Sequence, residues 1–229
     1  KKETVERCKA LMKKGGVHEL VGEWEMAEDE LLKALDLARD SEDKLLIAQA
    51  NNELGELMLL QGNYEEARTH LNISATYAEM VADTEILMKV YGSLGDLYFR
   101  QGLYDDARTY FIKSLEMGER IDQLSSLAKT VANLGLTFMN QGKYEEGIRH
   151  MKQYLEGFKQ KKDKMGMATL YTNLGIVHFE HGHYDEALEC YKRGLEYSSE
   201  LGNKQLQAIA IGCMGSVYQQ KGDFSRARD

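Results

Sequence analysis

The sequence predicts an all-α solenoid of antiparallel helix pairs, with about six repeats of which the last is incomplete. A glycine recurs every 40 residues without a change of register. An aromatic residue follows it by two positions, and a small residue lies three positions further on. A fixed period of this kind is the signature of a repeat architecture. The 229 residues also include no proline, which agrees with nearly continuous helix.

The recurring residues define where each repeat begins and ends. The glycines are Gly22, Gly62, Gly102, Gly142, Gly182 and Gly222. The aromatic residues are Trp24, Tyr64, Tyr104, Tyr144, Tyr184 and Phe224. A second set of glycines lies seven positions earlier, at Gly55, Gly95, Gly135, Gly175 and Gly215. We therefore place the repeats at about 3–42, 43–82, 83–122, 123–162 and 163–202, with a partial repeat at 203–229.

Each repeat is predicted to form two helices, as residues 43–82 illustrate. Asp43 is a suitable N-cap, and apolar residues then recur at the three- and four-residue spacing of a helix. Gly62 ends this first helix, because glycine adopts the left-handed conformation at low cost. Tyr64 begins the second helix, which runs to about Val81. The caps of the later repeats are Asp83, Gln123, Asp163 and Asn203. The glutamine is the weakest cap of this series.

Small side chains are expected to let the two helices of a repeat approach closely. Gly55 and Ala67 are predicted to face each other where the helices cross, and Tyr64 to fill the gap between neighbouring repeats. Neither helix buries its apolar face alone, so adjacent pairs must stack. The structural residues of the middle repeats are Gly62, Tyr64, Ala67, Gly102, Tyr104, Ala107, Gly142, Tyr144, Gly182, Tyr184 and Ala187.

The order of these residues resembles the tetratricopeptide repeat (TPR). The stretches that carry the resemblance most plainly are Leu134-Gly135, Phe138, Gly142, Tyr144 and Leu174-Gly175, His178, Gly182, Tyr184, Ala187. The resemblance covers the whole chain and implies a right-handed superhelical solenoid. The period of 40 differs from the 34 residues usual in the family, and the proline that often ends a repeat is absent.

The 40-residue period is similar to that of Leu-Gly-Asn-repeat scaffolds and of MalT-like and Rap-like bacterial regulators. The triplet Asn133-Leu134-Gly135 resembles the first group, but Leu136 replaces the asparagine that would follow, as does Ile176 one repeat later.

The two ends of the chain differ from the middle. In the first repeat Lys14 replaces the leucine before Gly15, and Trp24 replaces tyrosine, as in a capping repeat or through drift of a terminal repeat. The sixth repeat stops at Asp229, inside its second predicted helix. We expect the natural protein to continue, with more repeats or an effector domain.

Composition and charge argue against several classes of function. The chain is 43% hydrophobic and 29% charged, as in ordinary globular proteins, and has no apolar run of membrane-spanning length. We expect no signal peptide. A formal net charge of −8 argues against nucleic acid as a partner. That acidity reflects either solubility alone or an acidic docking surface.

The three widely spaced cysteines fit a reducing compartment, so we expect a cytoplasmic protein. Two of them, Cys190 and Cys213, are expected to be buried small residues rather than reactive thiols.

The resemblance to TPR proteins implies that the first helix of each pair lines a concave groove that binds peptides. The groove positions carried over to this chain are Lys89, Asp96, Phe99, Arg100, Lys129, Leu136, Met139, Asn140, Thr172, Ile176 and Phe179. Small residues beside apolar ones suit a peptide with Leu- or Phe-type anchors. Lys89, Lys129 and Arg100 would pair with acidic residues of that peptide. Phe99 and its counterparts Met139 and Phe179 either line the groove or pack against the next repeat.

The carboxylate clamp with which some TPR proteins hold chaperone tails is not expected here. The positions of that clamp hold Gly92, Ala132, Leu136 and Thr172 in place of lysine and asparagine.

No catalytic residue, cofactor or metal site is predicted. Carboxylate pairs such as Glu65–Glu66 recur at helix N-termini, where the helix dipole explains them better than acid–base catalysis does. His178, His181 and His183 have a spacing seen at zinc sites. However, His178 occupies a core position of the repeat, and the other two lie on a turn.

The sequence therefore predicts a non-enzymatic binding module. It would hold a peptide segment of another protein, or of its own C-terminal continuation, in the groove. The alternative, which the MalT-like resemblance implies, is a regulatory domain that senses a small molecule or short peptide and controls an attached effector. A DNA-binding or nucleotide-cyclase-like segment after Asp229 would favour sensing, whereas further repeats would favour a scaffold. Self-association through an exposed end of the stack is a third alternative.

Overall fold

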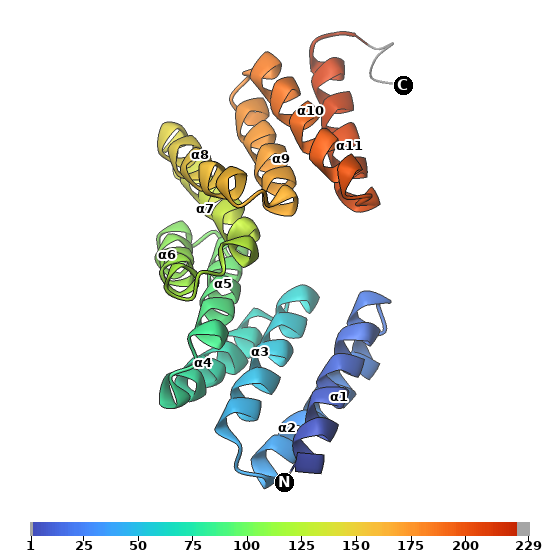
Figure 1. Ribbon diagram of the computed structural model, residues 1–229, viewed down its shortest axis with the longest axis vertical. Helices are drawn as coiled ribbons and strands as arrows, with labels where there is room; N and C mark the ends of the chain where they lie inside the picture. Colours follow the sequence, from blue (N-terminus) through green and yellow to red (C-terminus); the bar gives the residue numbers. More distant parts are fainter. Residues whose placement is uncertain (1, 224–229) are drawn as a thin grey trace. The chain divides into compact units, whose positions relative to one another are not determined.

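The computed structural model describes residues 2–223 and contains, in that range, eleven α-helices, one short 3-10 helix and no strand (Figure 1). The predicted all-α fold is confirmed. No helix between residues 2 and 223 combines the length and the apolar character needed to cross a lipid bilayer.

The chain divides into two compact units between Ile121 and Asp122. The first unit contains α1 (Lys2–Leu20), α2 (Trp24–Asp40), α3 (Lys44–Gln61), α4 (Tyr64–Val81), α5 (Thr84–Arg100) and α6 (Tyr104–Arg120). The second contains η1 (Leu124–Leu127), α7 (Ala128–Asn140), α8 (Tyr144–Gln160), α9 (Lys164–Glu180), α10 (Tyr184–Glu200) and α11 (Lys204–Gln220).

Consecutive helices pack as the predicted pairs. Helix α1 pairs with α2, α3 with α4 and α5 with α6, and the second unit repeats this with α7–α8 and α9–α10. Within each unit the first helix of one pair also contacts the first helix of the next, as Figure 1 shows for α1 and α3. The pairs therefore stack. The predicted second helix of the sixth repeat lies outside the described residues.

Side-chain caps begin most of the first helices, as the sequence predicts. An Asp43 carboxylate oxygen accepts hydrogen bonds from the backbone N–H groups of Leu45 and Leu46 at 3.1 Å. The same role falls to Asp83, Asp163 and Asn203. Gln123 makes no cap hydrogen bond, and the chain forms the 3-10 helix η1 before α7 begins. Glutamine is not among the residues that cap well, so this repeat begins less regularly and lies at the start of the second unit.

Two kinds of left-handed turn separate the helices. Within a pair the turn falls on a glycine, such as Gly62 with φ of 82°. Between pairs it falls on residues with side chains at four places, such as Glu42 and Ala82 with φ of 53° and 54°, and on Gly202 before α11. The repeat pattern predicts the first kind but not the second, because glycine marks a left-handed position whereas alanine and glutamate do not.

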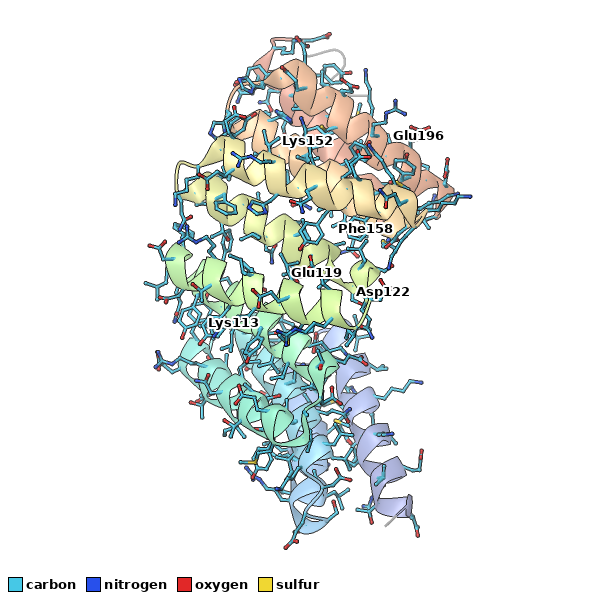
Figure 2. The ribbon with its side chains drawn as sticks, turned by 60° about the vertical axis from the view of Figure 1, so that its left-hand side comes forward. Lys113, Glu119, Asp122, Lys152, Phe158 and Glu196 are labelled. Atoms are coloured by element: carbon cyan, nitrogen blue, oxygen red, sulfur yellow. The ribbon has the colours of Figure 1, made fainter. Side chains whose placement is uncertain are left out.

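A glycine on the first helix of each pair packs against a large side chain of the second helix. A Cβ atom on Gly95 would lie 2.5 Å from Cδ1 of Phe111, well inside van der Waals contact. The five pairs with this geometry are Gly15–Leu31, Gly55–Leu71, Gly95–Phe111, Gly135–Met151 and Gly175–Tyr191. In the second unit a glycine is also used between repeats, where the ring of Phe158 (Figure 2) fills the space beside Gly166.

The predicted approach of small residues at the helix crossing is present as well. A Cβ on Gly147, which occupies the register of Ala67, would lie 2.8 Å from the carbonyl oxygen of Gly135. The large residue that fills the space beside each glycine was not predicted, because its type varies from leucine to phenylalanine, methionine and tyrosine.

Replacing the first cap tests how the helix pairs begin. We expect Asp43→Ala to lower the free energy of unfolding by about 1 kcal/mol, because the N–H groups of Leu45 and Leu46 lose their acceptor. Asp43→Asn keeps an acceptor oxygen and should lose far less. Urea denaturation of the three proteins measures both effects, and equal losses in the two variants would contradict the capping role.

Candidate functional site

A pocket of about 510 Å³ lies in the first unit between α1, α3 and α5. These are the first helices of three successive pairs, which the TPR resemblance identifies as groove-lining. The residues that line it are Met12, Lys13, Gly16, Val17, Leu20, Gln49, Asn52, Glu53, Asp83, Glu85, Ile86 and Lys89. A volume of this size lies within the range of pockets that bind ligands.

Helix α3 supplies the polar floor of the pocket. Asn52 and Glu53 lie three and four residues after Gln49, and Glu56 lies about one turn further along the helix. This spacing puts them on one face of the helix. The rest of α3 is mainly apolar and buried in the core of the first unit.

Asn52 is held in a fixed orientation with one polar atom left unsatisfied. Its side chain is almost fully buried, and its Nδ2 donates a hydrogen bond to Oε1 of Glu56 at 3.1 Å. The Ser93 hydroxyl donates to the same carboxylate oxygen at 2.8 Å. These contacts direct Asn52 Oδ1 away from Glu56, and within residues 2–223 this oxygen has no hydrogen-bond partner. The buried Oε1 of Gln49 has none there either. A buried acceptor without a donor costs about 1–3 kcal/mol.

Glu53 has an unusually high pKa. Burial raises the pKa of its carboxyl from 4.5 to about 7, and the nearby carboxylates of Glu56 and Glu19 add to this increase. Lys89 acts in the opposite direction. The Lys89 ammonium donates to Glu85 at 2.9 Å. Among the described residues, no ion pair or hydrogen bond neutralises Glu53.

Apolar side chains of α1 form the edge of the pocket. Leu20 is 85% exposed and Val17 is 53% exposed, although both are large hydrophobic residues. Met12 and Ile86 continue this apolar lining from α1 and α5. The site therefore combines an exposed apolar edge with a buried polar floor.

The groove residues predicted in the first unit have different environments. Lys89 lines the pocket and is paired with Glu85. Asp96 is buried and lies 3.6 Å from Nε of Arg100, which is exposed. Phe99 is half-buried, with its ring packed edge-on against Tyr104. Its contact with Tyr104 favours a packing role over an open groove position.

The groove residues predicted in the second unit also vary in exposure. Lys129 and Asn140 are exposed, and the Asn140 amide donates to the carbonyl of Leu136 at 2.9 Å. Leu136 and Met139 are half-buried. Thr172 is buried and donates to the carbonyl oxygen of Ala168, on its own helix.

Ile176 and Phe179 complete the set predicted in the second unit. Both are half-buried and pack against the core around α10 and α11, and Phe179 lies beside the ring of Tyr184.

Glu53 is not among the predicted site residues, whereas Gln49 and Asn52 occupy the same repeat positions as the predicted groove residues Lys89 and Thr172. A signal was present, because these three polar residues share one face of a helix that is mainly apolar. The residues that α1 contributes, such as Val17 and Leu20, belong to the first repeat, whose sequence departs from the pattern of the others. The pattern of the other repeats therefore gave no groove positions for them.

Three histidines of the second unit gather around Tyr144. The Tyr144 hydroxyl lies 2.8 Å from Nδ1 of both His178 and His183, and the His181 ring stacks on the tyrosine at 3.8 Å between centroids. A phenol has one proton, so it donates to one of the two nitrogens and accepts from the other. Burial, with Lys152 nearby, lowers the pKa of His178.

The histidine group is therefore part of the packing between repeats. His178 is buried, as its register predicts, and Tyr144 fills the gap to the next repeat. Among the described residues no group of three or more histidine, cysteine or acidic side chains is arranged to hold a metal ion.

A tyrosine group lies on α5 and α6 of the first unit, away from the pocket. The rings of Tyr98 and Tyr110 stack at 5.3 Å, and the ammonium of Lys113 (Figure 2) lies 5.0 Å from the centre of the Tyr110 ring. This arrangement is a cation–π contact on the surface of the helix pair.

The three thiols are free. Cys8 is buried, and its Sγ donates to the carbonyl oxygen of Ala34. Burial raises the pKa of Cys190 to about 11 and also raises that of Cys213. Both lie half-buried in helices, and a raised pKa disfavours the reactive thiolate.

Comparison with known families decides the assignment. The sequence pattern of the tetratricopeptide repeat matches residues 6–79 and 126–200, and a second pattern of the same description matches residues 87–121. The chain belongs to the tetratricopeptide repeat family. A comparison with curated protein sequences finds no match.

Solved structures share the TPR fold at low sequence identity. BtubC (BKLC) from P. vanneervenii is 22% identical with a TM-score of 0.73, over 90% of this chain and 87% of that one. A signal transduction ATPase with a TPR sensor from Pyrococcus horikoshii is 17% identical with a TM-score of 0.79, over 96% of this chain but only 34% of its own. Aspartyl phosphate phosphatase F from Bacillus subtilis is 16% identical with a TM-score of 0.77, over 99% and 68% of the two chains. At these identities the likeness shows the fold alone.

The pKa of Glu53 makes the stability of the first unit depend on pH. Because the folded pKa of about 7 exceeds the unfolded value of 4.5, the folded state binds more protons between these two pH values. The contribution of Glu53 to stability therefore falls as pH rises through this window and stays low above pH 7. We expect Glu53→Gln to raise the melting temperature at pH 8 and to give a smaller gain at pH 5.

Thermal denaturation at the two pH values measures this difference. Glu116→Gln, which removes an exposed carboxylate of α6, is the matched control and should show no such pH dependence. An equal gain from Glu53→Gln at both pH values would contradict the assignment of a raised pKa to this residue.

Proposed function

We propose that this TPR chain is a non-enzymatic interaction module that binds a peptide segment of a partner protein in the pocket of the first unit. The observation that carries the proposal is the combination of an exposed apolar edge with unsatisfied acceptors on the floor between α1, α3 and α5. A peptide supplies both complements, because its backbone N–H groups donate and its side chains bury apolar surface.

The contacts of the pocket suit an extended or helical segment with an apolar anchor. Val17, Leu20 and Met12 would cover a leucine- or phenylalanine-type side chain. Asn52 Oδ1 and Gln49 Oε1 would accept hydrogen bonds that they lack within the described chain. Since unpaired buried acceptors destabilise the free protein, a ligand that donates to them gains affinity.

The groove residues predicted in the second unit are proposed separately, as a peptide-contacting surface of that unit alone. Exposed Lys129 and Asn140 and half-buried Leu136 and Met139 offer polar and apolar contacts on α7. In the first unit Lys89 is already engaged by Glu85, which weakens its expected pairing with an acidic residue of the partner.

The proposed setting is the reducing cytoplasm. Cys8 is buried as a free thiol, and Cys190 and Cys213 are also unpaired. Unpaired cysteines fit a compartment that keeps thiols reduced. The partner would be another protein, or a further segment of the same polypeptide.

A sensing role is the second candidate. The pocket volume of about 510 Å³ also suits a small molecule or short peptide. One structural neighbour is described as having a TPR sensor, and another is a Rap protein complexed with competence and sporulation factor. In this role, ligand binding would change the packing of the helix pairs and so control an attached effector.

A display experiment tests the peptide-binding proposal. A random-peptide library is selected on the purified chain and then counter-screened on Val17→Glu/Leu20→Glu. Both side chains are exposed at the edge of the pocket, so the variant should stay folded while losing its apolar contacts with the peptide. We expect the selected peptides to share an apolar anchor and to lose most of their affinity for the variant.

A second double variant controls for the added charge. Met26→Glu/Met80→Glu introduces the same charges at exposed apolar positions outside the pocket and should leave binding unchanged. If no peptide is selected, or if the two variants bind equally well, this pocket is not a peptide site.

A further inference from the structure

We propose that the pocket of the first unit recognises a basic side chain of the partner peptide, arginine in preference to lysine, through Glu53, Asn52 and Gln49. This inference rests on the proposed function and specifies the residue that the peptide must carry. It also reverses the charge preference expected from Lys89, Arg100 and Lys129 at the sequence level.

The charges around the pocket favour a cation. Glu53, Glu85 and Asp83 line it, whereas its cations are Lys13 and Lys89. Lys89 is neutralised by Glu85, and two further carboxylates, Glu19 and Glu56, act on Glu53 from α1 and α3. The pocket is therefore lined by more carboxylates than ammonium groups.

The unsatisfied atoms of the floor are acceptors. Asn52 Oδ1 is directed away from the Glu56 carboxylate because the amide nitrogen is used in the hydrogen bond to that carboxylate. Reversing the amide would place an oxygen against a carboxylate, so Oδ1 is the buried atom of Asn52 that lacks a donor. Gln49 Oε1 and the Glu53 carboxylate lie on the same face of α3.

A guanidinium group matches this arrangement. It carries five N–H donors in one plane, is always charged and is weakly hydrated, whereas an ammonium is a compact and strongly hydrated point charge. One guanidinium can donate to a carboxylate and to two amide oxygens together. Its methylene stem would lie against the apolar edge formed by Val17 and Leu20.

Binding of a cation is coupled to ionisation of Glu53. The free protein holds this carboxyl with a pKa of about 7, so a bound guanidinium must displace a proton at pH values below that. The charged groups that act on Glu53 are Glu56 from its own helix, Glu19 from α1 and Lys89 from α5. The other charged residues that line the pocket are Lys13, Asp83 and Glu85. Affinity should therefore increase from pH 5.5 to pH 8.

The test uses a synthetic library of randomised octapeptides that are acetylated at the N-terminus and amidated at the C-terminus. Blocking both ends leaves side chains as the only source of positive charge. We expect peptides retained by the wild-type chain to be enriched in arginine at one position next to an apolar residue. Peptides retained by Glu53→Gln should lack this enrichment, whereas peptides retained by the surface control Glu116→Gln should show it.

A thermodynamic cycle on one selected peptide then isolates the contact. Replacing its arginine by citrulline, which is neutral and nearly isosteric, should weaken binding to the wild-type chain by about 10–100-fold, as expected for a charged hydrogen bond. The same replacement should have little effect with Glu53→Gln. Titration calorimetry at pH 5.5 and 8 should show tighter binding at the higher pH for the wild-type chain only.

The outcomes separate this inference from the proposed function. If the wild-type chain retains no peptide, the proposed function fails and the inference fails with it. If peptides are retained without enrichment in basic residues, the inference is wrong while peptide binding stands. The same holds if replacing arginine by citrulline weakens binding to the wild-type chain and to Glu53→Gln equally. Enrichment in lysine over arginine would overturn the preference for guanidinium.

Discussion

The close packing of a glycine on one helix against a large side chain on the next is the constraint on which the structure depends. Gly15, Gly55, Gly95, Gly135 and Gly175 each lie where a Cβ atom would collide with the partner helix. The large residue opposite fills the space that the missing side chain leaves, so the two helices approach closely without a cavity. The paired helices can then bury their remaining apolar surface only against the next pair, and this stacking brings the first helices together.

The pocket of the first unit follows from that stacking. Helix α3 is packed by its apolar residues into the core, and this fixes the direction of its polar face between α1 and α5. The Glu56 carboxylate accepts a hydrogen bond from the Ser93 hydroxyl and orients Asn52 by accepting a second one from its amide. Polar groups placed by a rigid core keep their geometry in the free protein, so a partner pays little of the ordering cost on binding. The unsatisfied acceptors and the unpaired Glu53 are the groups on which the proposed recognition of a peptide rests.

Most of the fold could be predicted from the sequence, because each repeat marks the same events with the same residue types. Capping by Asp43, the turn at Gly62 and the start of α4 at Tyr64 all follow from local chemistry. The exceptions have local reasons too. Gln123 does not cap its helix, and alanine gives no sign that Ala82 adopts a left-handed turn. The site was harder to predict, since Glu53 and Asn52 gain their properties from burial and from neighbours on other helices. Periodicity identifies equivalent positions, whereas this pocket depends on residues that differ between repeats.

Two adjacent glycines of α1 allow the central constraint to be measured directly. A Cβ on Gly15 would lie 2.8 Å from Cγ of Leu31, whereas a Cβ on Gly16 would meet nothing within 4 Å. The free energy of unfolding, measured by urea denaturation, should fall by about 1–3 kcal/mol in Gly15→Ala through overpacking. In Gly16→Ala it should rise by up to about 1 kcal/mol, because alanine is the better helix former. The same increase in both variants would show that the packing of helix pairs does not depend on the absent side chain, and would contradict the constraint.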